Sequence, residues 1–214
     1  MKKFFIGTFL LIAFLLLPFA FPFLGLTKPS EPANQFFPWA VKVENGKTNA
    51  FGVVLGDAAL SDFVLRWGDD FEIALITTPQ KENADAQLEV FYNKLSLGFV
   101  ESKVVLNLAA TPQDLENIVQ RAISSEVLKS GARKIKIAES DKTAAMARKI
   151  TAISVIPNVR LNENDIIQRF GNPAERKEMD GRVILKYPEK ALSVQVEEKQ
   201  KPLLEYVAAA DFLN

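Results

Sequence analysis

The sequence predicts an α+β protein: two related helix-plus-antiparallel-sheet units in tandem, after an N-terminal transmembrane or signal-anchor helix. A short pattern that occurs twice is the first observation behind this prediction. Asp62–Gly68 and Asp165–Gly171 both contain an acid, two apolar residues, an arginine, an aromatic residue and a glycine at the same spacing. Each copy is typical of a short amphipathic helix that ends at glycine, and strand-like segments follow each copy.

The N-terminus supplies the second observation. Two lysines precede an apolar run from Phe4 to Leu26, which is long enough to span a bilayer with the N-terminus in the cytoplasm. Cleavage after Ala20 or Gly25 is disfavoured, because the residue two places earlier is not small. We therefore expect a retained single-pass anchor in the inner membrane and a periplasmic remainder. A cleaved signal peptide is the alternative, since Pro18 interrupts the helix.

Composition narrows the chemistry. The chain has no Cys and no His, which excludes disulfides, thiol catalysis and Cys-ligated zinc and removes the usual general base. No serine has the lysine spacing of a Ser-Lys enzyme, and no phosphate-binding loop is present. Asp69, Asp70 and Glu72 lack the spacing of a calcium loop. The 26 basic and 26 acidic residues balance, so nothing favours nucleic acid. We expect no enzyme, no cofactor and no metal.

Changes in composition along the chain predict its organisation. Residues 1–26 form the anchor or signal peptide, and the proline-containing residues 27–39 form a linker. Residues 40–110 are the first αβ unit and residues 111–157 a connecting α/β segment. Residues 158–214 are the second αβ unit.

Aromatic residues at the end of the linker are candidates for partner binding. Phe36, Phe37 and Trp39 are the last aromatic residues of the linker and precede the first unit. They would either rest at the headgroup layer of the membrane or form the first core contact of the domain. We keep both interpretations open.

The first unit begins at Ala50–Gly56, with Asp57 as the candidate N-cap of a helix over Ala58–Trp67. Four apolar residues of this helix recur at helical spacing and form one face. Gly68 ends the helix. Alternating apolar residues then predict three strands: Phe71–Thr77, Ala86–Asn93 and Leu95–Asn107.

The connecting segment is predicted to contain two helices and two strands. Thr111 caps a helix that begins at Pro112, and its apolar stripe continues through Val127 until Ser130-Gly131 ends it. The remaining elements are a strand at Arg133–Ala138, a helix at Asp141–Lys149 and a strand at Ile150–Ile156.

The second unit repeats the order of a helix followed by a meander. Asn162 caps a helix over Glu163–Phe170, and Gly171 and Pro173 end it. Turn-forming residues separate three further strands: Arg182–Tyr187, Ala191–Glu197 and Leu203–Ala209.

Arginine and aromatic residues of the repeated pattern have structural explanations. Arg66 and Arg169 each follow an aspartate by four residues, a spacing that stabilises a helix slightly. Trp67 and Phe170 end the apolar faces, so we expect them in the core.

The densest basic region contains Arg133, Lys134 and Lys136 on one predicted strand. These side chains would contact an acidic partner or lipid headgroups, or else form a solvated face. They complete the set of candidate partner-binding residues.

The second unit resembles the SmpA/OmlA (BamE-like) family over about Asn158 to Ala209. The resemblance rests on the capped helix, the run Arg169–Pro173, a hairpin, Lys186–Pro188 and an amphipathic strand. The tandem form is similar to β-lactamase-inhibitor-like proteins, which join two such units. These resemblances imply an extracytoplasmic protein that binds other proteins through its sheet or loops, without catalysis.

The sequence therefore predicts a membrane-anchored periplasmic adaptor or envelope-assembly factor whose partner is an envelope or membrane protein. A binder of lipid or another small hydrophobic ligand between the sheets is the alternative, and an enzyme using carboxylates or a Ser-Lys pair is a third. The adaptor predicts a filled core with an exposed patch or free sheet edge. The second predicts an apolar cavity, and the third a polar cleft with converging titratable groups.

Overall fold

The computed structural model describes residues 36–78 and 86–212. The anchor predicted at Phe4–Leu26 lies outside these residues, as does most of the predicted linker. Within the described ranges, no helix has the length and apolar character needed to cross a membrane. Residues Ala33–Asn214 form one compact unit.

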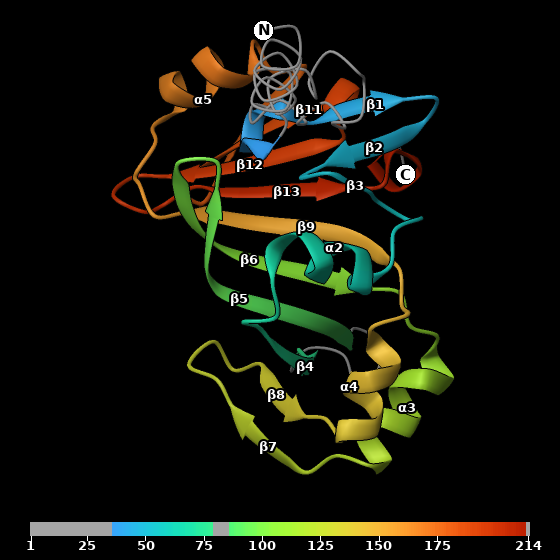
Figure 1. The fold of residues 1–214 in the computed structure, drawn as a ribbon. Helices are drawn as coiled ribbons and strands as arrows, with labels where there is room; N and C mark the ends of the chain where they lie inside the picture. Colours follow the sequence, from blue (N-terminus) through green and yellow to red (C-terminus); the bar gives the residue numbers. More distant parts are fainter. Residues whose placement is uncertain (1–35, 79–85, 213–214) are drawn as a thin grey trace, which may run out of the picture. The chain divides into compact units, whose positions relative to one another are not determined.

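A ten-stranded antiparallel sheet dominates this unit (Figure 1), in the order β10-β11-β12-β13-β9-β6-β5-β4-β8-β7. A smaller sheet has the order β1-β2-β3. With the helices, these sheets confirm the α+β class. The strands of the large sheet are β4 (Glu72–Thr77), β5 (Gln87–Leu97), β6 (Val100–Leu108), β7 (Ser124–Val127), β8 (Arg133–Lys136), β9 (Ile150–Pro157), β10 (Glu175–Met179), β11 (Arg182–Tyr187), β12 (Leu192–Glu197) and β13 (Leu203–Val207). Those of the small sheet are β1 (Lys42–Glu44), β2 (Lys47–Ala50) and β3 (Val53–Val54).

Short helices connect and flank the strands. The α-helices are α2 (Leu60–Trp67), α3 (Pro112–Gln120), α4 (Glu139–Ala145), α5 (Glu163–Phe170) and α6 (Ala209–Phe212). Two 3-10 turns complete the described chain, η3 (Pro38–Ala40) and η4 (Pro188–Lys190).

Helices α2 and α5, which carry the repeated pattern, share an acid in the first turn and a glycine at the end, whereas only the N-cap of α5, Asn162, accepts a side-chain hydrogen bond. Both have eight residues. The shared aspartate accepts a hydrogen bond from the N-cap backbone, at 2.9 Å in Asp62 to Ala59 and 2.9 Å in Asp165 to Asn162. The shared glycine ends each helix with a φ of +86° or +87°. The acid therefore stabilises the helix N-terminus, and the glycine permits the left-handed exit.

Each of these helices leads into an antiparallel meander. Helix α2 precedes β4, β5 and β6, which pair in that order, and α5 precedes β10, β11, β12 and β13, which also pair in order. Strand β9 lies between β6 and β13 and pairs antiparallel with both. Hence β9 and β13 join the strands that follow the two helices into one continuous sheet.

The prediction of a helix from Pro112 through Val127 is wrong in its second half. Helix α3 ends at Gln120, and the next residues form β7, an edge strand paired with β8. Serines and β-branched residues between 123 and 127 favour a strand over a helix, and β8 offers unpaired backbone groups. Gly131, expected to end the helix, instead adopts a φ of +86° in the turn between β7 and β8.

Other boundaries also differ from expectation. The break expected near Lys94 is instead a turn at Gly98-Phe99, because a bulge after Tyr92 lets β5 continue to Leu97. The N-cap of α2 is Ala59, and the candidate Asp57 is ion-paired with Lys47. The second helix of the connecting segment begins and ends earlier than expected, at Glu139–Ala145. Strands β1, β2, β3 and β10 were not predicted.

Ion pairs join the helices of the connecting segment to each other. The Arg121 guanidinium lies 2.6 Å from the Asp141 carboxylate, whose side chain is almost fully buried. Arg148, just beyond α4, contacts Asp114 of α3 at 3.1 Å and also donates to the Ala109 carbonyl. The Arg148 guanidinium holds the pKa of the Asp114 carboxyl well below its usual range.

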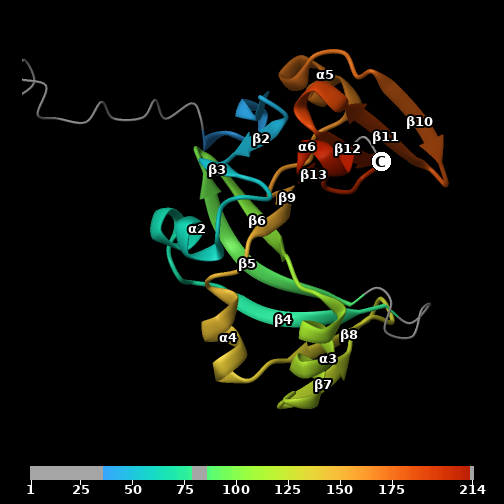
Figure 2. The ribbon, with the colours of Figure 1, turned by 90° about the vertical axis from the view of Figure 1, so that its right-hand side faces the viewer.

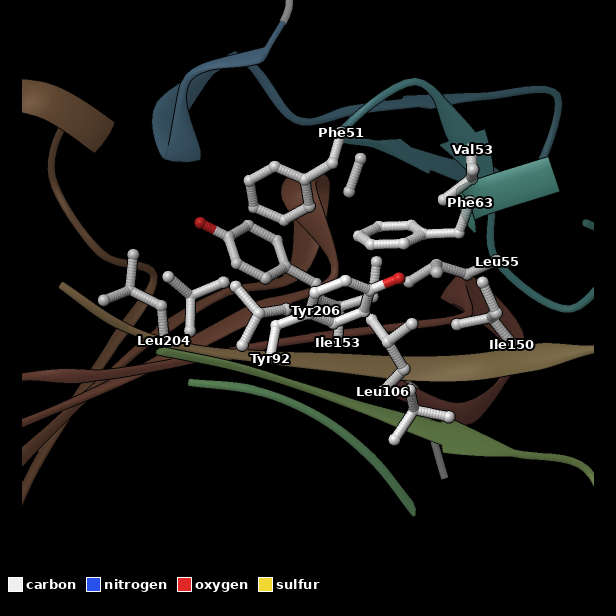
Figure 3. Packing of buried hydrophobic residues seen from close by; sticks show 14 of the residues in the cluster. Phe51, Val53, Leu55, Phe63, Tyr92, Leu106, Ile150, Ile153, Leu204 and Tyr206 are labelled. Carbon is white, nitrogen blue, oxygen red and sulfur yellow. The ribbon is translucent and has the colours of Figure 1, made fainter. Parts of the chain in front are cut away.

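One hydrophobic core contains residues of both sheets and of the helices. Figure 3 shows aromatic rings at its centre, where Phe63 of α2 lies close to Tyr92 of β5 and Phe51 packs edge-on against Tyr206 of β13. The centroids of Phe51 and Tyr206 are 5.0 Å apart. The Tyr206 hydroxyl donates a buried hydrogen bond of 2.6 Å to the Pro38 carbonyl. Residues far apart in sequence thus stabilise a single core.

The large sheet has one face in this core and one face outside it. Buried residues of α2, α3, α4 and α5 belong to the same core cluster as alternate residues of the sheet strands. In Figure 2, α2 and α4 lie on one side of β4, β5 and β6. Because successive side chains of a strand point to opposite faces, the remaining residues of these strands face away from the helices.

Candidate functional site

The face of the large sheet opposite the helices is the first candidate site, and we call its centre the open face. Two rows of paired residues cross strands β5, β6, β9 and β13. The open face is defined by the rows Phe91, Val105, Ser154, Glu205 and Glu89, Asn107, Ala152, Val207.

Residues of the open face combine apolar and polar character. All eight are half-buried, and none of them belongs to the core cluster that contains the buried residues of the helices. Phe91, Val105 and Val207 supply apolar area, and Ser154, Asn107 and two glutamates supply hydrogen-bonding groups. Protein–protein interfaces combine apolar area with hydrogen-bonding groups, although glutamate is depleted in their cores.

Glu89 is electrostatically unusual within the open face. Its strand neighbours are Ala74 and Asn107, and Asn107 donates its side-chain hydrogen bond to Gln87. Burial raises the pKa of the Glu89 carboxyl from 4.5 to about 7. A carboxyl that is costly to ionise here becomes easier to ionise when a cationic group approaches it.

We expect Glu89→Gln to stabilise the protein at neutral and higher pH. The folded state holds the Glu89 proton more tightly than the unfolded chain, so stability from this group falls as pH rises from 4.5 to about 7. After a discount for partial exposure, the variant should gain about 1–2 kcal/mol at about pH 8. The gain should shrink as the pH falls and vanish at about pH 3, below both pKa values, where the carboxyl is protonated in the folded and the unfolded state. Urea unfolding at the two pH values measures it.

Glu44→Gln, at an exposed position of β1, is the control for removal of one negative charge. If Glu89→Gln changed the free energy of unfolding equally at both pH values, the claim that burial raises the pKa of Glu89 would be contradicted.

The aromatic residues at the end of the linker form the second candidate site. The Phe37 ring stacks on Trp39 at 5.0 Å and contacts Phe99, at the tip of the β5–β6 hairpin, at 4.8 Å. Phe36 packs edge-on against Trp67 at 5.6 Å. These contacts agree with the interpretation of the segment as a first core contact, since Trp39 packs against the core cluster. Contact with the headgroup layer stays a prediction.

The two arginines of the repeated pattern also reach this segment. The Arg66 guanidinium lies 4.9 Å from the centre of the Phe36 ring, and the Arg169 guanidinium lies 5.7 Å from that of Trp39. Arg169 also donates to the backbone carbonyl of Asp165. Cation–π contact with the segment is therefore a role of these arginines that helix spacing alone does not predict.

Trp67 and Phe170 behave as core-contacting residues. Phe170 is buried and lies 5.8 Å from Tyr187. Trp67 is half-buried, and its indole N–H donates to the Phe51 carbonyl at 3.2 Å.

A surface pocket of about 490 Å³ opens beside the aromatic residues. Its lining is mainly apolar and comes from η3, the β5–β6 turn, the segment after β9 and α5. Arg169 and Glu101 are the charged residues that line it. The volume is within the range of small-ligand pockets.

The basic candidates lie on β8, two strands from β5 in the sheet order. Arg133 and Lys136 are exposed, whereas Lys134 contacts the Glu72 carboxylate at 2.7 Å and lies 5.8 Å from the Phe91 ring. The structure thus brings Phe36, Phe37 and Trp39 together. It places Lys134 and Lys136 beside the open face, where Lys136 pairs with Ala74, the strand neighbour of Glu89.

Titratable groups do not gather into a metal site in the part of the chain described here. Among residues 36–78 and 86–212, no three or more Asp or Glu side chains are grouped to hold an ion. Asp57 pairs with Lys47 and Glu72 with Lys134, which accounts for two acids near the first helix.

Sequence reasoning missed Phe99, Glu89 and Ser154. The turn at Gly98 was not predicted, so Phe99 read as one residue within a strand. Glu89 and Ser154 lie on strands that were predicted, but the strand order that places them in neighbouring rows is not visible in the sequence.

Comparisons with known proteins gave no match. No protein-family model matches the chain, and searches of curated proteins and of solved structures found no match.

Proposed function

We propose that this protein is a non-enzymatic, membrane-anchored periplasmic adaptor that binds another envelope protein through the open face. The carrying observation is the pair of residue rows across β5, β6, β9 and β13, which lie on the sheet face opposite the helices. A partner would bury the apolar residues Phe91, Val105 and Val207 and hydrogen-bond to their polar neighbours.

The proposal includes a tandem origin for the two αβ units. The two helices of the repeated pattern and the meander after each support two copies of one module. On this view β9 is the fourth strand of the first copy, and the segment from α3 to α4 is an insertion before it. The last strands of the copies, β9 and β13, then pair antiparallel and make one continuous face.

Inner-membrane attachment rests on the apolar run Phe4–Leu26 and the two lysines before it. The resemblance of residues 158–209 to SmpA/OmlA proteins, and of the tandem form to β-lactamase-inhibitor-like proteins, adds the expectation of an extracytoplasmic protein-binding role. An anchor would keep the open face close to envelope partners and raise their effective concentration.

The test is a pull-down of the full chain from solubilised envelope membranes, comparing Ser154→Arg with Leu65→Arg. Ser154 lies in the centre of the open face, beside Val105 and Glu205, so an arginine there has a carboxylate to pair with. Leu65 is 90% exposed on the opposite, helix-bearing side. We expect Ser154→Arg to lose the captured protein, by a factor of roughly 30 or more, and Leu65→Arg to retain it.

Both variants should keep the wild-type unfolding midpoint, which separates lost binding from lost folding. Equal capture by Ser154→Arg and the wild type would contradict the open face as the binding surface. The absence of any envelope protein above background in all three samples would contradict the adaptor function itself.

The pocket beside Trp39 favours a second candidate, a binder of a small amphiphile. Its apolar lining would hold an alkyl chain, and Arg169 would hold an anionic head. The space between the two sheets, where such a ligand was first expected, holds the packed aromatic core. Calorimetric titration with dodecanoate tests this function: saturable binding that Arg169→Gln weakens supports it, and no heat of binding contradicts it.

A further inference from the structure

The strongest surface feature that the open face does not use is the end of the sheet beside the pocket. We define the basic tip by Phe99, Val159, Lys103, Arg160, Arg169 and Lys201. Phe99 is 79% exposed, and Val159 is also exposed. Exposed apolar residues ringed by cations have the composition of a surface that contacts anionic lipid.

Shared neighbours bring these residues to one place. Phe99, Val159 and Arg169 line one pocket, and Lys103 and Lys201 line a second. Glu101 and Asn158 line both pockets, so the two adjoin. Asn158 also accepts a hydrogen bond from Lys201 at 2.5 Å.

The charge of this region is mainly positive. Glu101 is the one acid among the residues lining the two pockets, and it is itself ion-paired with Lys94 at 3.0 Å. The lining cations Arg169, Lys103 and Lys201 therefore outnumber it, and Arg160 adds a further exposed cation next to Val159.

Local geometry fixes Phe99 in its exposed position. Leu97 pairs with Val100, so Gly98 and Phe99 form a two-residue hairpin turn in which Gly98 has a φ of +65°. A Cβ on Gly98 would lie 2.0 Å from the Phe37 ring, so that ring lies directly against the turn. Phe37 covers one side of the tip, and the Phe99 side chain remains outward.

The position of the basic tip along the chain indicates which surface it contacts. Phe37 and Trp39, which contact Phe99, follow the apolar run by only a short segment. Even fully extended, the chain from Leu26 to Phe36 spans at most roughly 35 Å. An anchor at Phe4–Leu26 would therefore hold the tip near the surface of its own bilayer.

From this geometry we propose that the basic tip docks on the anionic lipid surface of the membrane that holds the anchor. Phe99 and Val159 enter the headgroup layer, and the cations contact lipid phosphates. This inference rests on the proposed membrane attachment but not on partner binding by the open face. Docking would orient the sheet relative to the membrane and leave the open face for a protein partner.

The absence of cysteine from the chain permits a direct test. Full-length Phe99→Cys, Val159→Cys and Leu65→Cys variants are labelled with a fluorophore and reconstituted in vesicles that carry a headgroup-level quencher. One set contains phosphatidylcholine alone, and the other also contains phosphatidylglycerol. We expect quenching at positions 99 and 159 in the anionic vesicles, less in the neutral ones, and none at the control position 65.

Charge variants test the cations separately. Lys103→Glu with Lys201→Glu should weaken docking roughly fivefold for each cation removed. Arg133→Glu with Lys136→Glu, a matched pair of exposed cations on β8, should leave quenching at position 99 unchanged.

The outcomes of these experiments distinguish docking of the basic tip from membrane attachment through the anchor. A chain that resists a high-salt wash but shows no quenching at position 99 overturns docking and keeps the anchor. A chain that the wash removes, yet is quenched at position 99 beforehand, supports docking and contradicts the anchor. Equal quenching at positions 65 and 99 also overturns docking. So does a result in which a captured protein, and not lipid, shields the fluorophore at position 99 from the quencher.

Discussion

Replacing Phe63 with alanine is expected to lower the free energy of unfolding by about 3–5 kcal/mol. The Phe63 side chain is fully buried and contacts Tyr92 at a centroid distance of 5.6 Å and Trp67 at 6.0 Å. The substitution deletes the buried ring together with its packing contacts, and it leaves a cavity between α2 and the sheet. Chemical denaturation followed by tryptophan fluorescence measures the loss.

Position 166 tests whether both halves of the sheet unfold together. Ile166 occupies the same place in the second copy of the pattern and is also fully buried. Ile166→Ala should shift the same single transition, by about 2–5 kcal/mol, because one core contains both residues. Leu65→Ala, at the exposed face of α2, should change little. Two separate transitions, only one of them shifted by each variant, would contradict a common core.

A loss of similar size, about 3–5 kcal/mol, is expected for Tyr206→Ala. Tyr206 is fully buried on β13, and its ring meets Phe51 while its hydroxyl bonds to the Pro38 carbonyl. One side chain thus connects the large sheet, the residues between β2 and β3, and the end of the linker. Thermal unfolding checks the overall loss.

Tyr206→Phe isolates the hydroxyl of this residue. It keeps the ring packing and leaves the Pro38 carbonyl without its donor, which should cost about 1–3 kcal/mol. Trp39 follows Pro38 directly, so its fluorescence should report a looser segment in this variant. A Tyr206→Phe variant as unstable as Tyr206→Ala would contradict the division between packing and hydrogen bond.

The sequence predicted the helices of the repeated pattern well because their signals are local. An aspartate at the third helical position, apolar residues at helical spacing and a terminal glycine act within one segment. Helix α5 has the bounds expected for it, Glu163–Phe170. The predicted tandem relation stays a proposal, although the two helices share the first-turn acid and the terminal glycine.

Elements that depend on distant partners were not predictable in the same way. Strand β7 forms where an apolar stripe indicated a helix, because β8 supplies backbone partners that sequence periodicity does not report. Strand β10 is exposed along its whole length, so it has no apolar alternation to identify it. Because of the bulge after Tyr92, the turn lies several residues later than the sequence predicted, and Phe99 lies at the tip of a hairpin.

The candidate sites also divide into those with a local sequence signal and those that depend on distant strands. Phe36, Phe37 and Trp39 were recognisable because they are aromatic residues at the end of a polar, proline-containing linker. The open face was not, since Ser154 and Glu89 come to lie in neighbouring rows of one face only through the order β5-β6-β9-β13. Their partner-binding role, like that of Arg133, Lys134 and Lys136, stays a prediction.

The most direct test of the proposed adaptor function is position-specific photo-crosslinking in cells with the anchor intact. A photoreactive phenylalanine analogue at position 91 or 105, in the open face, should crosslink to one envelope protein. The same analogue at position 65, on the helix-bearing side, should not, and Ser154→Arg should abolish the crosslinks from position 91. Crosslinks of equal yield from positions 65 and 91, or crosslinks from position 91 that survive Ser154→Arg, would contradict the account.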